Sequence, residues 1–85
     1  MLRSTAYTTL LRDGRYGLAR RLAMAEAASR ESARDALIEA GRALARRDRD
    51  GWRAACLLAA AHYRAAGDAS MATHWTRRAS LSRAV

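Results

Sequence analysis

Two similar segments constrain this chain more than any other feature: residues 10–19 (LLRDGRYGLA) and residues 63–72 (YRAAGDASMA). In each, a helical run ends at a glycine, Gly14 or Gly67, and a second run begins at once. Glycine adopts the left-handed backbone conformation that ends many helices. An alanine five positions after each glycine lets the two helices approach closely. The two segments therefore predict two tight antiparallel helical hairpins.

The composition favours an all-α fold. Of the 85 residues, 22 are alanine and 16 are arginine, and there is no proline to interrupt a helix. We expect a single helical domain over residues 1–85, built as a small antiparallel bundle or stack. A domain of this size buries only about 60–65% of the surface of its unfolded chain. Its own core is therefore small, and we expect it to associate with a partner or with itself as a homo-oligomer.

Helix signals predict about five helices. They cover residues 4–12, 15–29, 32–47, 52–66 and 69–84. Ser4 is the expected N-cap of the first, and Ser32 followed by Asp35 resembles a capping box that would begin the third. Nothing in residues 27–33 is a strong helix breaker, so one bent helix through the second and third runs is the alternative.

Residues 47–51 (RDRDG) predict a clearer break, because aspartate suits a helix N-cap and glycine suits a turn. The helix that follows is apolar on most of its circumference, through Leu57, Leu58 and their neighbours. We therefore expect it to be the central helix of the bundle.

The two hairpin segments resemble the tetratricopeptide repeat, in which an aromatic residue, Gly-Asp and two alanines seven positions apart define a helical hairpin. The residues at matching positions are Tyr63, Gly67, Asp68, Ala72 and Ala79 in the second segment, and Leu10, Gly14, Tyr16 and Ala19 in the first. The two glycines are 53 residues apart, which is no multiple of the 34-residue repeat period, and the terminal prolines are missing. The expected architecture is therefore a tetratricopeptide-like stack of irregular register.

The resemblance implies a protein-binding adaptor or co-chaperone, in which first helices of successive hairpins line a groove for a partner peptide or helix. The residues at groove positions are Thr8, Leu11 and Arg12 in the first segment, and Leu57, Ala61 and Arg64 in the second. Arginines there favour an acidic or carboxylate-bearing partner. The alternative is that Leu57 and Ala61 belong to the core and that the arginines are ordinary surface.

Further partner-binding candidates surround the predicted break. They are Arg42, Arg46, Arg49 and Trp52. With Arg53, the arginines would form one basic stripe if a helix continued through the segment, but Asp48, Asp50 and Gly51 favour a capped turn between solvated ends. Trp75 is expected to fill a hairpin seam, and Trp52 is the indole we expect at an interface if either is exposed.

The net charge of +8 supports an alternative function, a small basic helical regulator of transcription that acts through nucleic acid or through a regulatory protein. The Gly-aromatic turn and alanine-rich helix of residues 12–28, with the Trp-to-Cys segment of residues 52–56, resemble small bacterial helical regulators. We nevertheless expect a protein partner before nucleic acid, because the arginines are spread along the chain without any lysine.

No pattern of catalytic, cofactor-binding or metal-binding residues stands out, so we expect neither an enzyme nor a cofactor. The two histidines, His62 and His74, lack the further ligands that a metal site requires, and Cys56 lies in an apolar segment where a thiol is usually inert. One cysteine allows no internal disulfide and fits a reducing compartment. The longest apolar run, residues 54–61, is too short to cross a bilayer. We therefore expect a bacterial cytoplasmic protein with no membrane partner.

Overall fold

The computed structural model describes residues 5–81, which form four helices and no strand. The helices are α1 (Thr5–Arg12), α2 (Tyr16–Ala45), α3 (Arg49–Ala65) and α4 (Ala69–Leu81). The all-α expectation is confirmed. The expected number of helices is too high, because the second and third predicted helices are one continuous helix, α2. The expected N-cap Ser4 and the end of the last predicted helix, residues 82–84, lie outside the described residues.

Helix α2 is continuous because no residue between positions 27 and 33 interrupts it, which was the alternative left open by the sequence. The capping box predicted at Ser32 and Asp35 is wrong, since both residues lie in the middle of α2. Thirty helical residues span about 45 Å at 1.5 Å per residue. This helix therefore accounts for most of the longest dimension of the molecule, 50 Å.

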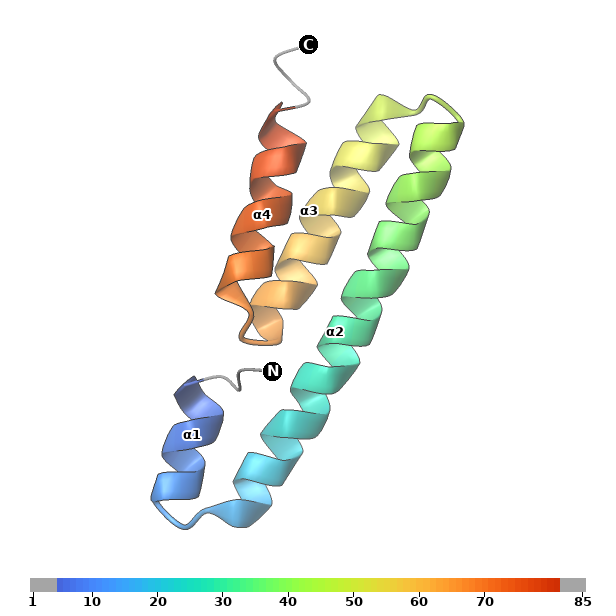
Figure 1. Ribbon diagram of the computed structural model, residues 1–85. Coiled ribbons are helices and arrows are strands. Elements are labelled where there is room, and N and C mark those ends of the chain that lie inside the picture. Colours follow the sequence, from blue (N-terminus) through green and yellow to red (C-terminus); the bar gives the residue numbers. More distant parts are fainter. Residues whose placement is uncertain (1–4, 82–85) are drawn as a thin grey trace.

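The other helices pack along different parts of α2. Figure 1 shows α1 beside the N-terminal half of α2, α3 beside its C-terminal half, and α4 beside α3. Each helix runs antiparallel to the one before it. The helix after the 47–51 break, α3, packs against both α2 and α4, so it is central among the three C-terminal helices, but α2 likewise has two neighbours, α1 and α3. The expectation that α3 has little exposed surface is wrong, because Leu57 and Leu58 are exposed.

The two glycine turns have the predicted geometry. Gly14 and Gly67 adopt left-handed φ angles of 75° and 79°. After α1, the amide of Arg15 donates to the carbonyl of Leu10 at 2.8 Å; after α3, the amide of Asp68 donates to the carbonyl of Tyr63 at 2.9 Å. These bonds, with shorter-range bonds from the glycine amides, form the Schellman motif that ends a helix. Both predicted helix breaks are confirmed.

The turn between α2 and α3 has the same hydrogen bonds but no glycine. Arg47 takes the left-handed position, with φ 58°, and the amide of Asp48 donates to the carbonyl of Ala43 at 2.8 Å. The predicted break is confirmed, but Gly51 is not part of the turn. It lies inside α3, where its amide donates to Asp48 Oδ1 at 2.9 Å. A Cβ at position 51 would collide with the Asp48 carboxylate, so the cap explains this glycine.

The core is built mainly from small side chains. The buried apolar residues are Ala19, Ala33, Ala36, Ala40, Ala43, Cys56, Ala59, Ala60, Tyr63, Ala66, Ala72 and Ala79. Trp75 packs against buried clusters that contain residues of α2, α3 and α4, so its predicted place in a helix seam is confirmed. Trp52 is also half-buried, against a cluster that includes Cys56. Almost all of this core lies between α3, α4 and the C-terminal half of α2.

Candidate interaction surfaces

One face of α3 presents apolar side chains to solvent. Leu57, Ala61 and Arg64 are exposed, and their spacing of four and then three residues puts them on one side of the helix. Leu57 is 42% exposed, and the adjacent Leu58 is 52% exposed. The interpretation of Leu57 and Ala61 as core is therefore wrong. The residues of α3 that face the other helices are instead Cys56, Ala59, Ala60 and Tyr63.

The predicted groove residues of the first segment lie on α1. Thr8, Leu11 and Arg12 are exposed, and no residue of α1 is buried. Because α1 lies beside the N-terminal half of α2 and α3 beside its C-terminal half, the two predicted groups are displaced along the long axis (Figure 1). The structure therefore brings together Leu57, Ala61 and Arg64, but it does not make α1 the opposite wall of their surface.

A groove that the sequence did not predict runs between α2 and α3. It has a volume of about 330 Å³ and is lined by Ser32, Asp35, Ala36, Glu39, Ala55 and Leu58. The carboxylate of Glu39 forms an ion pair with Arg42 one helical turn away. The four α2 residues of this groove have the spacing of one helix face, which is visible in the sequence. Ser32 and Asp35 also match a capping box, and for that reason the sequence predicts a helix start there instead of a groove.

The arginines around the α2–α3 turn form a cluster instead of a stripe. The predicted break lies between Ala45 and Arg49, so Arg42 lies on α2, Arg46 is the C-cap of α2 in the turn, and Arg49 begins α3. The hairpin nevertheless brings these arginines to one end of the molecule. Trp52, which the sequence placed with them as an interface residue, is half-buried against the core.

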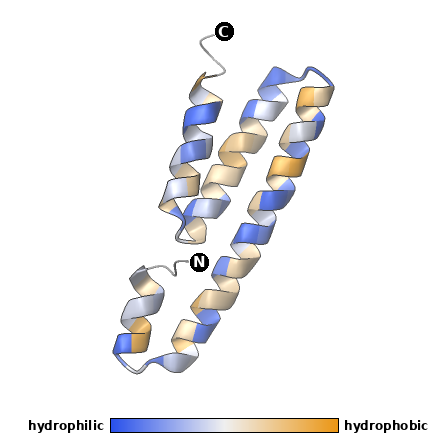
Figure 2. Cartoon of the chain, in the orientation of Figure 1, coloured by the Kyte–Doolittle hydropathy of each residue, from blue (hydrophilic) through white to orange (hydrophobic). Residues whose placement is uncertain are grey.

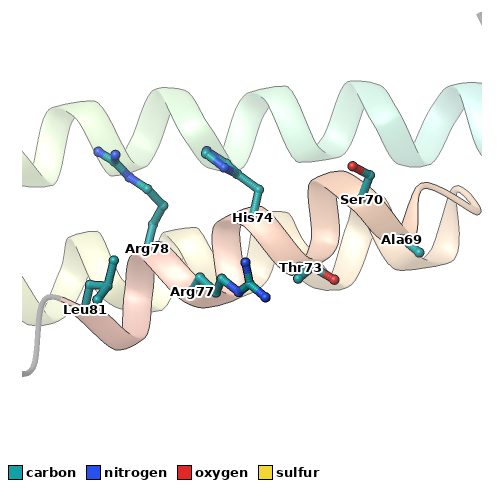
Figure 3. Close-up of a pocket in the computed structure, with 7 residues that line it drawn as sticks. All are labelled: Ala69, Ser70, Thr73, His74, Arg77, Arg78 and Leu81. Carbon is teal, nitrogen blue, oxygen red and sulfur yellow. The ribbon is translucent and has the colours of Figure 1, made fainter.

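The outward side of α4 carries polar and basic side chains. A shallow, open depression of about 620 Å³ is lined by Ala69, Ser70, Thr73, His74, Arg77, Arg78 and Leu81. In Figure 3, His74 and Arg78 project from one side of α4, while Arg77 projects from another. The His74 ring meets Trp75 edge-on, with ring centroids 4.9 Å apart. Since every lining residue comes from one helix, this surface lacks the second wall that a ligand pocket needs.

A charged residue that the sequence did not single out is buried in α2. Glu26 is only 2% exposed, and its carboxylate lies 3.9 Å from the guanidinium of Arg30. The pair sits on the side of α2 that also buries Ala19 and Ala33. Its spacing of four residues was visible in the sequence, but burial of a glutamate depends on tertiary packing.

The potentially reactive groups are separated from one another. Burial raises the pKa of the Cys56 thiol, and the positive charge of Arg78 partly opposes this change. A neutral, buried thiol is a poor nucleophile. Within residues 5–81, no three His, Cys, Asp or Glu side chains are grouped so that they could hold a metal ion. None of the described helices has the combined length and apolarity of a membrane span.

Comparison with known proteins adds no relative. No protein family, curated protein or solved structure matches this chain. The resemblance to the tetratricopeptide repeat therefore rests on the two turn segments and the helical hairpins that they form.

Proposed function

We propose that this chain is a non-enzymatic protein-interaction module, an adaptor or co-chaperone that presents a tetratricopeptide-like helical surface to a protein partner. The observation that carries the proposal is the distribution of side-chain size. Within residues 5–81, the interior is filled largely by alanine, and Cys56 is the largest side chain that is fully buried. Large apolar side chains lie outside: Leu11, Tyr16, Leu18, Met24, Ile38, Leu44, Leu57, Leu58 and Leu81.

This distribution gives a chain that acts alone little stabilisation from its large apolar side chains. Burial of a leucine side chain is worth about 1.5–3 kcal/mol, and small domains have little stability to spare. Single exposed apolar residues are ordinary, but adjacent leucines on a central helix form a surface that a partner could cover. Leu57 and Leu58 are such a pair.

The outer face of α3 is the proposed contact surface. It combines the apolar side chain of Leu57, the small side chain of Ala61 and the guanidinium of Arg64. Because α3 packs between α2 and α4, these residues stand on a rigid support. An amphipathic helix or extended peptide could place apolar groups on Leu57 and a carboxylate on Arg64.

The hairpin of α3 and α4 supports the tetratricopeptide-like interpretation. Gly67 ends α3 in the left-handed conformation, Asp68 Oδ1 accepts a hydrogen bond from the amide of Met71, and Ala72 is buried in the seam. The free thiol of Cys56 fits a reducing compartment, so we propose a cytoplasmic setting.

Affinity capture with matched variants tests the proposal. Leu57→Asp alters the α3 surface, while Met24→Asp makes the same kind of change at a more exposed position on α2, 66% exposed. We expect the wild type and Met24→Asp to retain the same protein and Leu57→Asp to lose at least about tenfold in affinity, the effect of removing a central contact. Circular dichroism of both variants establishes that they fold. Equal retention by all three proteins would reject α3 as the contact surface.

A further inference from the structure

Three parts of the chain contribute arginines to one end of the bundle: the end of α2, the turn into α3, and the end of α4. The packing of Ala40, Cys56 and Ala79 in one cluster shows that these parts lie together. We call this region the basic end. Its arginines are Arg42, Arg46, Arg47, Arg49, Arg53, Arg77 and Arg78. Figure 2 shows the α2–α3 turn as a hydrophilic segment at this end of the molecule.

Acidic residues are concentrated in the middle of α2, and arginines are concentrated where α2 meets α3. Residues 26–39 contain four acidic residues and two arginines, whereas residues 42–53 contain five arginines and two aspartates. One of those aspartates, Asp48, is occupied as the N-cap of α3, where it accepts the hydrogen bond from Gly51. The basic end therefore has a strong local excess of positive charge.

The backbone of Arg47 provides a second, independent observation. All three turns place one residue in the left-handed region, and the other two use Gly14 and Gly67 for it. An arginine there is strained, because its Cβ crowds the following carbonyl. Residues held in such conformations cluster at functional sites. Among residues 5–81, the one non-glycine residue with a positive φ is therefore also a cation of the basic end.

From the cluster, the local excess of positive charge and the strained arginine together, we infer that the basic end binds the phosphate backbone of a nucleic-acid duplex. Guanidinium groups form paired hydrogen bonds with phosphate oxygens, and arginines on three segments can meet several phosphates in succession. A second copy of the chain is disfavoured as the occupant by the net charge of +8. An acidic amphipathic helix fits the outer face of α3 better, because Leu57 and Arg64 lie on the same side of that helix.

This site is separate from the protein-binding surface proposed above. Its contacts are with the arginines of the basic end, whereas that surface centres on Leu57 of α3. A chain with both would join a protein partner to a nucleic acid. Either site could exist without the other, so the two proposals can fail independently.

Fluorescence anisotropy with a labelled duplex DNA of about 20 base pairs tests the inference. The slope of log K against log salt concentration gives the number of phosphate contacts. The test variant is Arg46→Ala with Arg47→Gly. The control is Arg20→Ala with Arg21→Ala, which removes the same charge from exposed positions at the other end of α2. We expect the test variant to reduce the slope of log K against log salt by about 2. We expect the control to leave that slope nearly unchanged.

The single variant Arg47→Gly separates binding from folding. It should weaken DNA binding and reduce the salt slope by about 1 while raising the melting temperature, because glycine relieves the left-handed strain. The inference is overturned if the wild-type chain does not bind the duplex at about 50 mM salt, a concentration that favours phosphate contacts. It is also overturned if both double variants lose affinity equally, or if polyglutamate binds the basic end as tightly as DNA does.

Discussion

The two halves of this molecule are held together differently. In the C-terminal half, three helices share a seam of buried alanines with Cys56 and Tyr63 at its centre. In the N-terminal half, α1 has no buried residue, and the facing part of α2 buries only Ala19 and Glu26. The comparison teaches that small residues can hold a bundle when three helices meet, but give little support to a single short helix.

The turns also favour the C-terminal half, because α3 and α4 have side-chain N-caps, whereas α2, which follows the N-terminal turn, has none. Asp48 and Asp68 each end one helix and cap the next, by accepting hydrogen bonds from Gly51 and Met71. At the corresponding position before α2, Arg15 makes no side-chain cap. The N-terminal hairpin therefore lacks both the shared seam and the capping bond. We expect it to open more easily than the C-terminal half.

The largest difference in stability should come from alanine substitutions at two tyrosines, one buried in the seam and the other exposed to solvent, namely Tyr63 and Tyr16. Tyr63 is 8% exposed within the seam, while Tyr16 is 68% exposed at the start of α2. Tyr63→Ala should destabilise the chain by about 3 kcal/mol, because it leaves a cavity between three helices. Tyr16→Ala should change the stability by less than about 0.5 kcal/mol. Chemical denaturation followed by circular dichroism measures both, and similar losses would contradict the contrast between the halves.

The two turn glycines should give a smaller and qualitatively different contrast. Gly14→Ala and Gly67→Ala each force a side chain into the left-handed region, at a cost of about 1–2 kcal/mol. At Gly67 the cost should lower the free energy of global unfolding, because α3 and α4 belong to the shared seam. At Gly14 it should mainly release α1. NMR chemical shifts would locate the change, and a global loss in both variants would contradict the account.

Substitutions at two N-cap positions should give the smallest changes in stability. Asp68→Ala removes the bond to the Met71 amide and should cost about 1 kcal/mol. Arg15→Asp supplies a cap that α2 lacks and should stabilise the N-terminal hairpin by about 0.5 kcal/mol. Thermal unfolding of the two variants tests the pair. Destabilisation by Arg15→Asp would mean that the missing cap does not explain the weaker hairpin.

Much of this fold could be predicted from local sequence. Gly14 and Gly67 mark helix ends because the left-handed conformation suits glycine, and Asp48 marks a cap through its side-chain oxygen. The turn at Arg47 could be predicted as a break but not in its conformation, since arginine rarely adopts a positive φ. The continuity of α2 stayed open because alanine-rich residues permit either one helix or two.

The candidate surfaces were harder to predict. Helical periodicity alone placed Leu57 among apolar neighbours, and only the packing of α2 and α4 on the other faces shows that it is exposed. The arginines on either side of the α2–α3 turn are close in sequence, so their gathering was partly predictable. Arg77 and Arg78 join them through tertiary packing, which no local pattern reports.

Amide hydrogen exchange measured residue by residue by NMR tests most directly the central claim that the three-helix half is a cooperative unit supporting the α3 surface. We predict that amides of α3 and of α2 between residues 33 and 43 exchange only by global unfolding, whereas those of α1 exchange at least about a hundredfold faster. Equal protection in all four helices, or faster exchange in α3 than in α1, would contradict the account.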